Sequence, residues 1–166
     1  MSRIEIRPER PDEVAALRRI HERVFPLPDE ADLVDRLRAD GDIVLALVAA
    51  DPEPVGHIVF SRLLVPDPSV KISALAPVSV LSERQRQGIG GMLVIEGLTR
   101  LREAGEDVVL VLGDPGYYSR FGFLTQAAKA FRSVYEGPYF QALPFTDAGR
   151  FAHGEVTYPP AFAALG

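Results

Sequence analysis

The feature that most constrains the fold of this chain is a succession of strand, glycine turn, helix and strand between residues 71 and 112. Residues 71–80 are a predicted strand, and residues 88–104 carry Val94, Leu98 and Leu101 at the spacing of one helix face. Gly105 then ends the helix, and residues 108–112 are a second strand of valines and leucines. A connection of this kind places its two strands side by side and parallel.

The residues before this unit predict antiparallel strands. Ile4 and Ile6 alternate with charged residues as in a half-buried strand, and two helices follow before Gly41. Residues 43–49 and 55–61 are strands joined by a short turn. Beyond Phe123 the pattern is weaker, with candidate strands at 139–143 and 155–158. We therefore expect one α+β domain over residues 1–166, with a central mixed and mostly antiparallel sheet flanked by helices.

Composition narrows the classes of function. The formal net charge is −5, so the chain lacks the basic footprint of a nucleic-acid-binding protein. It has no cysteine, which excludes disulfides and thiolate metal sites, and no His, Asp and Glu group has metal-ligand spacing. The longest apolar runs fall short of the roughly 20 residues that cross a membrane, and the first residues lack a signal-peptide core. We expect a cytoplasmic protein without a metal.

The segment Gln85-Arg86-Gln87-Gly88-Ile89-Gly90-Gly91 joins the first strand of the unit to its helix. The start of a helix has unpaired N–H groups and the positive end of the helix dipole, so it binds anions. Gly88 and Gly90 have no Cβ, which lets phosphate oxygens approach the backbone, and Arg84 and Arg86 add positive charge. We predict a phosphate site here. The simpler alternative is a tight connection that uses glycine only to begin a helix.

A second motif follows the second strand. Residues 112–123 read Leu-Gly-Asp-Pro-Gly-Tyr-Tyr-Ser-Arg-Phe-Gly-Phe. Ligands of such sheets bind outside the carboxyl ends of the strands, so the two motifs predict one site. The glycine turn is not a P-loop, because no Lys-Ser/Thr follows it, and its spacing differs from the dinucleotide-binding GxGxxG.

Both motifs resemble those of the GNAT superfamily of N-acetyltransferases, whose acetyl-CoA-binding motif is Gln/Arg-x-x-Gly-x-Gly/Ala. Gln85, Gly88 and Gly90 match that motif, and Tyr118 stands four residues before Gly122-Phe123. The second motif is similar to that of the bacterial subgroup called YhbS-like predicted acetyltransferases, and the resemblance covers nearly the whole chain. It implies the GNAT acyl-CoA N-acyltransferase fold, with two splayed parallel strands, and transfer of an acetyl group from acetyl-CoA to a primary amine by direct attack in a ternary complex.

The resemblance also implies roles for particular residues. Backbone groups of Val78 and Val80 would bond to the pantetheine arm, and an N–H near Val80 would stabilise charge on the thioester oxygen. Tyr118 would donate a proton to the departing thiolate, whereas Tyr117 is expected to point elsewhere and Phe121 to belong to the core. The expected cofactor-binding residues are Val78, Ser79, Val80, Gln85, Arg86, Gln87, Gly88, Gly90, Gly91 and Tyr118.

The residues leave open which group deprotonates the amine. Glu83, just before the glycine turn, is a candidate base but also suits a solvated charge. His57 has an ordinary pKa of about 6.5 but also suits a buried structural histidine in an apolar strand. Asp114 follows a parallel strand, where Asp-Pro-Gly is also ordinary turn chemistry. Water alone could serve as the base, since His21 is predicted on a helix surface or at an interface, and His153 in a loop.

The sequence does not identify the acceptor. We expect a small-molecule or protein amine, bound by the first two helices and residues 127–143, whose aromatic residues either form an apolar wall or pack the sheet. The alternative function is a non-catalytic acyl-CoA-binding or sensing domain on the same fold, and a third is an unrelated nucleotide-binding protein. A homodimer is the expected assembly, since two-fold dimers are the commonest soluble oligomers.

Overall fold

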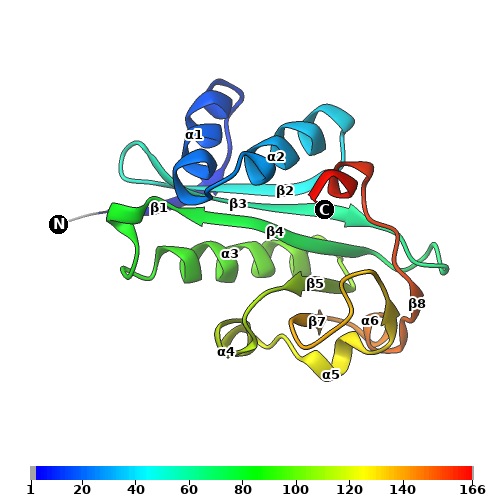
Figure 1. Ribbon diagram of the computed structural model, residues 1–166. Helices are drawn as coiled ribbons and strands as arrows, with labels where there is room; N and C mark the ends of the chain where they lie inside the picture. Colours follow the sequence, from blue (N-terminus) through cyan, green and yellow to red (C-terminus); the bar gives the residue numbers. More distant parts are fainter. Residues whose placement is uncertain (1–2, 166) are drawn as a thin grey trace.

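The computed structural model describes residues 3–165 and shows a six-stranded sheet with helices on both faces (Figure 1). The strand order is β1-β2-β3-β4-β5-β7, and within this sheet only the β4–β5 pair is parallel. The strands are β1 (Glu5–Pro8), β2 (Ile43–Ala50), β3 (Pro54–Leu63), β4 (Ile72–Val80), β5 (Val108–Leu112) and β7 (Phe140–Pro144). The mixed, mostly antiparallel α+β fold expected from the sequence is confirmed.

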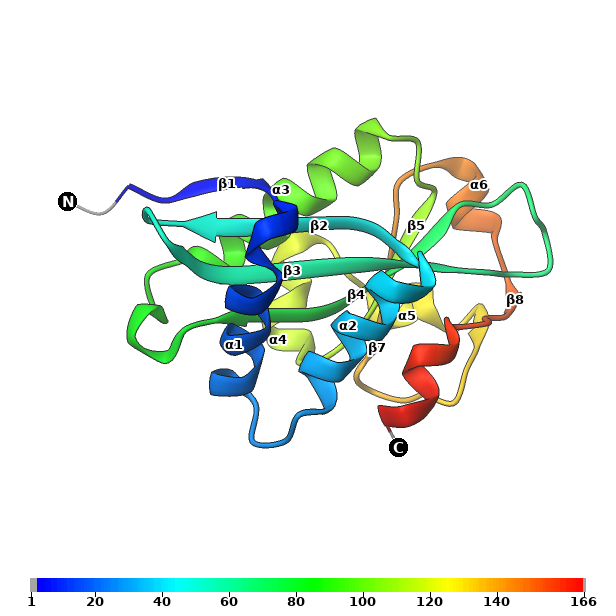
Figure 2. The same ribbon diagram turned by 90° about the horizontal axis from the view of Figure 1, so that it is seen from above.

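The helices divide between the two faces of the sheet. The first two cover one face and the third covers the other, while the last turn of the chain lies beside the second helix (Figure 1 and Figure 2). The α-helices are α1 (Val14–Val24), α2 (Asp29–Asp40), α3 (Ile89–Glu103), α4 (Pro115–Tyr118), α5 (Thr125–Ala128) and α6 (Asp147–Phe151). The 3₁₀ segments are η1 (Pro11–Glu13), η2 (Ser82–Arg84), η3 (Ser119–Phe121) and η4 (Pro160–Leu165).

Local sequence signals account for several helix boundaries. Gly41 ends α2 in the left-handed conformation with φ 74°, and its N–H bonds back to the last turn of the helix. Gly105, with φ 90°, follows α3 in the same way. The Asp114 carboxylate accepts a hydrogen bond from the N–H of Gly116 and so caps α4, whose first residue is Pro115. The ends of α2 and α3 are the ones that the sequence predicts, and the cap of α4 is consistent with the turn chemistry expected at Asp114.

The end of the chain differs from the expectation. The strand predicted at residues 155–158 is reduced to β8 (Gly154–Glu155), which pairs in parallel with β6 (Phe131–Arg132). Thr157 forms only an isolated bridge with Leu64. Prolines 159 and 160 have no N–H to donate to a ladder, and the second of them begins η4. The ladder with β6 ends earlier, where the chain changes partner: the N–H of Val156 donates to the carbonyl of Arg132, and the N–H of Thr157 donates to the carbonyl of Leu64.

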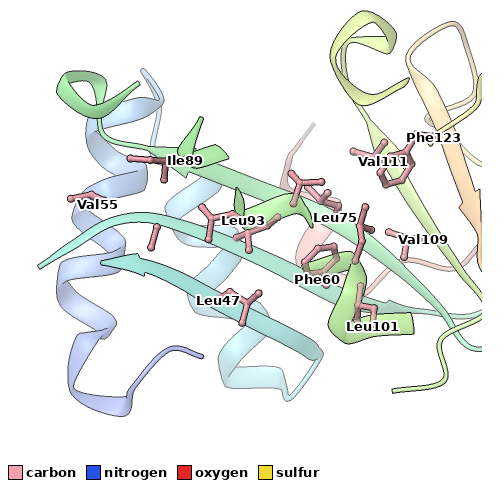
Figure 3. Close-up of a cluster of buried hydrophobic side chains, with 14 residues drawn as sticks. Leu47, Val55, Phe60, Leu75, Ile89, Leu93, Leu101, Val109, Val111 and Phe123 are labelled. Carbon is pink, nitrogen blue, oxygen red and sulfur yellow. The ribbon is translucent and has the colours of Figure 1, made fainter. Parts of the chain in front are cut away.

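The main hydrophobic core lies between α3 and the sheet. Figure 3 shows Phe60 of β3 and Leu75 of β4 in one cluster with Leu93 and Leu101 of α3, and all four side chains are almost fully buried. Close contact at this interface depends on Gly97 of α3. A Cβ at that position would lie 2.5 Å from Cε2 of the buried Phe60 ring. The glycine therefore sets how closely the helix that follows the glycine turn approaches the sheet.

We predict that Gly97→Ala lowers the free energy of unfolding by about 1–3 kcal/mol, because the ring of Phe60 has no room to move. This loss outweighs the better helix propensity of alanine. Gly91→Ala is the matched control in the same helix, because a Cβ there would meet Phe121 at an ordinary 3.8 Å. Urea denaturation of both variants measures the difference. Equal midpoints for Gly97→Ala and the unsubstituted chain would contradict this packing argument.

Candidate functional site

A cleft of about 400 Å³ opens at the carboxyl end of β4, between the glycine turn and α4. The two sequence motifs therefore meet at one place, as predicted. Gln87 does not line the cleft, and the half-buried Tyr118 packs against the core. The expected binding residues that do line it are Val78, Ser79, Val80, Gln85, Arg86, Gly88, Gly90 and Gly91.

The backbone of the glycine turn is shaped as an anion cradle. Arg86 and Gly88 are both left-handed, with φ 64° and φ 80°. A non-glycine residue in this region costs about 1–3 kcal/mol and is typical of ligand sites. The first helical hydrogen bond of α3 is donated by Met92 to the carbonyl of Gly88, so the N–H groups of residues 89–91 have no partner within the helix. Such a turn directs open N–H groups at an anion.

The parallel strands β4 and β5 separate beside this turn. Their pairing ends at Leu75 and Val111, although β4 continues to Val80. The N–H of Leu81 donates to the carbonyl of Val55 (2.9 Å), so alternate residues of β4 face β3, and Val78 and Val80 aim their backbone groups toward the gap. The side-chain amide of Gln85 donates to the carbonyl of Val80 (2.9 Å). The gap thus presents the edge of a strand to a ligand.

The charge around the cleft is opposite in sign to the net charge of the chain. Arg84, Arg86 and Arg120 line it, and among its lining residues in the described chain none is acidic. Arg84 is held by Asp51 (2.8 Å) and by the side chain of Gln87 (3.2 Å). It therefore braces the turn, which explains why Gln87 faces away. The arginines compensate locally for the formal charge of −5.

The two tyrosines of the second motif differ in position. Tyr117, expected to point elsewhere, lines the cleft, and its hydroxyl lies 3.3 Å from the place of a Cβ on Gly90. Tyr118 packs edge-on against Tyr117 and Phe123, with ring centroids 5.0 and 5.8 Å apart. Burial raises the pKa of Tyr118 to about 12. Arg120, a lining residue that the sequence analysis missed, stacks on the Tyr117 ring at 4.9 Å.

Two of the candidate bases have ordinary structural surroundings. The carboxylate of Glu83 is exposed and pairs with Arg23 (3.1 Å). A hydrogen bond from its own backbone N–H, together with the nearby Arg23, lowers the pKa of Glu83, which makes it a weaker base. Asp114 accepts from the Gly116 N–H and caps α4. A catalytic role for either carboxylate stays a prediction.

The histidines form the least expected feature of the site. His21, predicted at a surface or interface, is fully buried (0 % exposed) on α1, and this part of the prediction is wrong. Its Nδ1 lies 2.7 Å from Oγ of Ser79, and its Nε2 lies 2.9 Å from Nδ1 of His57. Nε2 of His57 lies 2.8 Å from the carboxylate of Glu9. His57 is buried, as one of its two interpretations required, while His153 lies exposed in a loop.

Within residues 3–165, no group of three or more His, Asp or Glu side chains could hold a metal ion. No helix there is long and apolar enough to cross a membrane.

The fold and the cleft define the class of this protein. Residues 5–125 match the sequence profile described as the acetyltransferase (GNAT) domain. The chain therefore belongs to the GNAT family of acetyltransferases, as the motif resemblance predicts. It is 38% identical over 134 residues to an uncharacterised N-acetyltransferase, YhbS of Escherichia coli K12, and the match covers 80% of each chain.

Solved structures agree with this assignment. The crystal structure of E. coli YhbS in complex with CoA has a TM-score of 0.92 at 34% identity, and the match covers 100% of this chain and 95% of that one. A GNAT family acetyltransferase from Brucella melitensis in complex with acetyl-CoA has a TM-score of 0.83 at 40% identity, covering 98% and 99%. The splayed-strand GNAT fold implied by the resemblance is therefore confirmed.

Burial, reinforced by the positive charge of Arg38, lowers the pKa of His21 to about 3. An unfolded histidine has a pKa of about 6.5, so between pH 6.5 and pH 3 the unfolded chain binds a proton that the folded chain does not. We predict that the free energy of unfolding decreases as the pH is lowered through this window. His21 contributes up to about 1.4 kcal/mol of this decrease per pH unit.

Urea denaturation at pH 7, 6 and 5 measures this effect. His21→Gln should remove the contribution and flatten the pH dependence, whereas the exposed control His153→Gln should keep it. Parallel pH profiles for the unsubstituted chain and His21→Gln would show that His21 is not held neutral by the fold.

Proposed function

We propose that this chain transfers an acetyl group from acetyl-CoA to a primary amine of a small molecule or protein, with both substrates bound together. The observation that carries the proposal is the open edge of β4 at Val78 and Val80, directly beside the open N–H groups of α3. The relatives from E. coli and B. melitensis bind CoA and acetyl-CoA respectively, which supports the same ligand here.

The residues of the cleft fit a coenzyme A diphosphate. The left-handed turn and the first N–H groups of α3 provide donors, and Arg86 and Arg120 provide charge that no lining carboxylate opposes within the described chain. A Cβ on Gly90 would lie 3.3 Å from the Tyr117 hydroxyl and 3.9 Å from Val80, so any side chain there would fill the space. The glycine keeps that space open.

Acetyl-CoA, when bound, supplies a thioester that is already activated toward an amine. The chain therefore contributes mainly alignment. The backbone groups of Val78 and Val80 can continue the sheet onto a pantetheine arm, in the manner of strand addition. The N–H groups at this edge are donors for negative charge that develops on oxygen.

Tyr118 is the proposed proton donor to the leaving sulfur. Burial raises its pKa to about 12, so the phenol is protonated throughout the neutral range, while the same shift makes it a weaker acid toward the thiolate. Its ring lies over Gly113 at the end of β5, where any side chain would collide with it. That placement puts the tyrosine at the second edge of the gap between the parallel strands.

The acceptor amine is proposed to enter from the α1 side of the cleft. Val24, the last residue of α1, and Ser79 line the cleft there. The segment 127–143, expected to line the acceptor site, contributes no lining residue to this cleft. Its Phe131 and Phe140 are buried in a separate core cluster, and Tyr135 packs on Tyr158.

The first test concerns the glycine turn. Gly90→Glu should weaken CoA binding about 100-fold or more, equal to about 2.7 kcal/mol, because the new carboxylate fills the cleft and repels the diphosphate. Thr99→Glu is the matched control, since it adds the same charge to an exposed position of the same helix. Calorimetry with CoA measures both affinities, and circular dichroism checks the fold. Unchanged affinity in folded Gly90→Glu would remove the turn from the site.

The second test concerns turnover. Release of free thiol from acetyl-CoA is measured with a panel of primary amines, and Tyr118→Phe should lower kcat about 100-fold while leaving CoA affinity unchanged. Tyr117→Phe is the control, because it keeps the ring that stacks with Arg120. CoA binding without turnover for any amine would favour the sensing domain, and equal kcat values for both variants would end the case for Tyr118.

The proposal also covers the cellular location and the oligomeric state of the protein. We propose that the protein works in the bacterial cytoplasm, and that it forms a homodimer, the commonest closed oligomer. Cell fractionation with an antibody against the chain tests the first. Light scattering on the purified chain tests the second.

A further inference from the structure

An unbroken line of hydrogen-bonded side chains crosses the α1-covered face of the sheet. It runs from Ser79 on β4 to His21 on α1 (2.7 Å), then to His57 on β3 (2.9 Å) and to Glu9 after β1 (2.8 Å). Ser79 is 3% exposed and both histidines are fully buried. Beyond Glu9, Nε and Nη2 of Arg38 on α2 donate hydrogen bonds to the Glu9 carboxylate, each at 3.1 Å.

The carboxylate at its end determines the last hydrogen bond of this line. An ionised carboxylate only accepts hydrogen bonds, so Nε2 of His57 carries a proton. A relay toward Glu9 requires that this is the only proton on the His57 ring, so that Nδ1 of His57 accepts from Nε2 of His21. Nδ1 of His21 then accepts from the hydroxyl of Ser79. In this pair of tautomers every donor points from Ser79 toward Glu9.

The two ends of the line lie in different surroundings. Ser79 lines the cleft, and its oxygen keeps lone pairs that can accept a proton there. Glu9 is partly exposed, with 20% of its side chain accessible to solvent. Burial alone would raise the pKa of Glu9, but the hydrogen bond from His57 and the hydrogen bonds and charge of Arg38 lower it below the ordinary value. A proton that reaches Glu9 is therefore released to water.

We propose that Ser79, His21, His57 and Glu9 form a proton relay that carries a proton from the acceptor ammonium in the cleft to solvent at Glu9. The inference rests on the proposed acetyl transfer and adds the fate of the amine proton. The N–H bond of the ammonium breaks and an O–H bond forms at Ser79, while the original Ser79 proton passes to Nδ1 of His21. The Nε2 proton of His21 passes to Nδ1 of His57, and that of His57 passes to Glu9. Both rings end neutral with their proton on Nδ1, and the amine keeps its lone pair. Release of the Glu9 proton to water and rotation of both rings restore the Nε2–H tautomers before the next turnover.

The acceptor amine must lose a proton before it can attack. An alkyl ammonium has a pKa of about 10, so most acceptor molecules arrive protonated at pH 7. The charged groups that face the two rings are Glu9 and Arg38, and Arg38 also approaches Asp35 (3.5 Å). A carboxylate thus lies at the far end of the line from the cleft.

A purely structural role makes different predictions. Buried polar groups are usually hydrogen-bonded, and such a network can serve only to satisfy them. A structural network requires no particular tautomer at His21, and its disruption would lower activity equally at every pH. The relay requires Nε2–H on both rings. Loss of the relay should have little effect at a pH near the amine pKa, where bulk water already deprotonates the amine.

The first measurement is independent of turnover. Nitrogen-15 NMR of the histidine side chains in the purified full chain at pH 7 reports which nitrogen carries the proton. We expect neutral rings protonated at Nε2 for both His21 and His57. A proton on Nδ1 of His21 would make it a donor to Ser79 and would overturn the relay.

The second measurement is the pH profile of kcat/KM for thiol release with a simple alkylamine. Glu9→Gln keeps the acceptor for His57 but has no carboxylate to take the proton, so kcat/KM should fall about 100-fold at pH 7. The loss should shrink as the pH approaches the amine pKa of about 10. Ser79→Ala should behave in the same way, and Ser79→Thr, which keeps the hydroxyl, should retain activity.

His153→Gln is the control, since this exposed histidine lies in a loop outside the line, and its profile should match that of the unsubstituted chain. A loss in Glu9→Gln that is the same at every pH, or no loss at all, would refute the relay while leaving acetyl transfer standing. Absence of turnover by the unsubstituted chain with every amine would refute the transfer and the relay together.

Discussion

The early end of the ladder between β4 and β5 is the constraint on which the site depends. Pairing stops at Leu75 and Val111, and the β3–β4 register shifts over the next residues, where Pro77 has no N–H to donate. Backbone groups left unpaired inside a fold cost about 1–3 kcal/mol each. The Gln85 amide satisfies the Val80 carbonyl, and the remaining groups open into the cleft. The fold therefore leaves a strand edge that a ligand can complete.

Successive side chains at the end of β4 point to opposite faces of the sheet, so this segment contributes to two parts of the site. Val78 and Val80 turn their side chains to the α3 core, whereas Ser79 between them faces α1 and meets His21. One three-residue stretch thus offers backbone groups to the gap and a hydroxyl to the polar line on the other face. Each member of that line has a partner, which is the condition under which buried polar groups are tolerated.

Local patterns predicted the parts of the structure that local chemistry decides. The glycines and the helix period of residues 88–104 set the turn and α3, and Gly41 set the end of α2. His21 was misplaced because a histidine next to an apolar helix stripe is normally assigned to solvent. Its burial depends on Ser79 and His57, which are 58 and 36 residues away along the chain. Contacts of that range follow from sheet order and register, which no local pattern encodes.

The same limit explains the tyrosines and the arginines. In a helix of only four residues, tertiary packing determines which side chain points to the core. Here Tyr118 packs against the core, whereas Tyr117 and Arg120 line the cleft. Arg84 has the right charge for a phosphate, but Asp51, 33 residues earlier, holds it as a brace of the turn. The family motif locates the site because it records the backbone that the ligand requires. The assignment of roles to its side chains needs the three-dimensional neighbours.

Electrostatics connects the two halves of the proposed mechanism. A cleft with arginines and open N–H groups favours a diphosphate, and the bound diphosphate then offsets the charge of those arginines. An amine must be neutral to attack, so its proton has to leave by a route of its own. The carboxylate of Glu9, across the sheet from the gap and reached through two neutral rings, lies where that path would end.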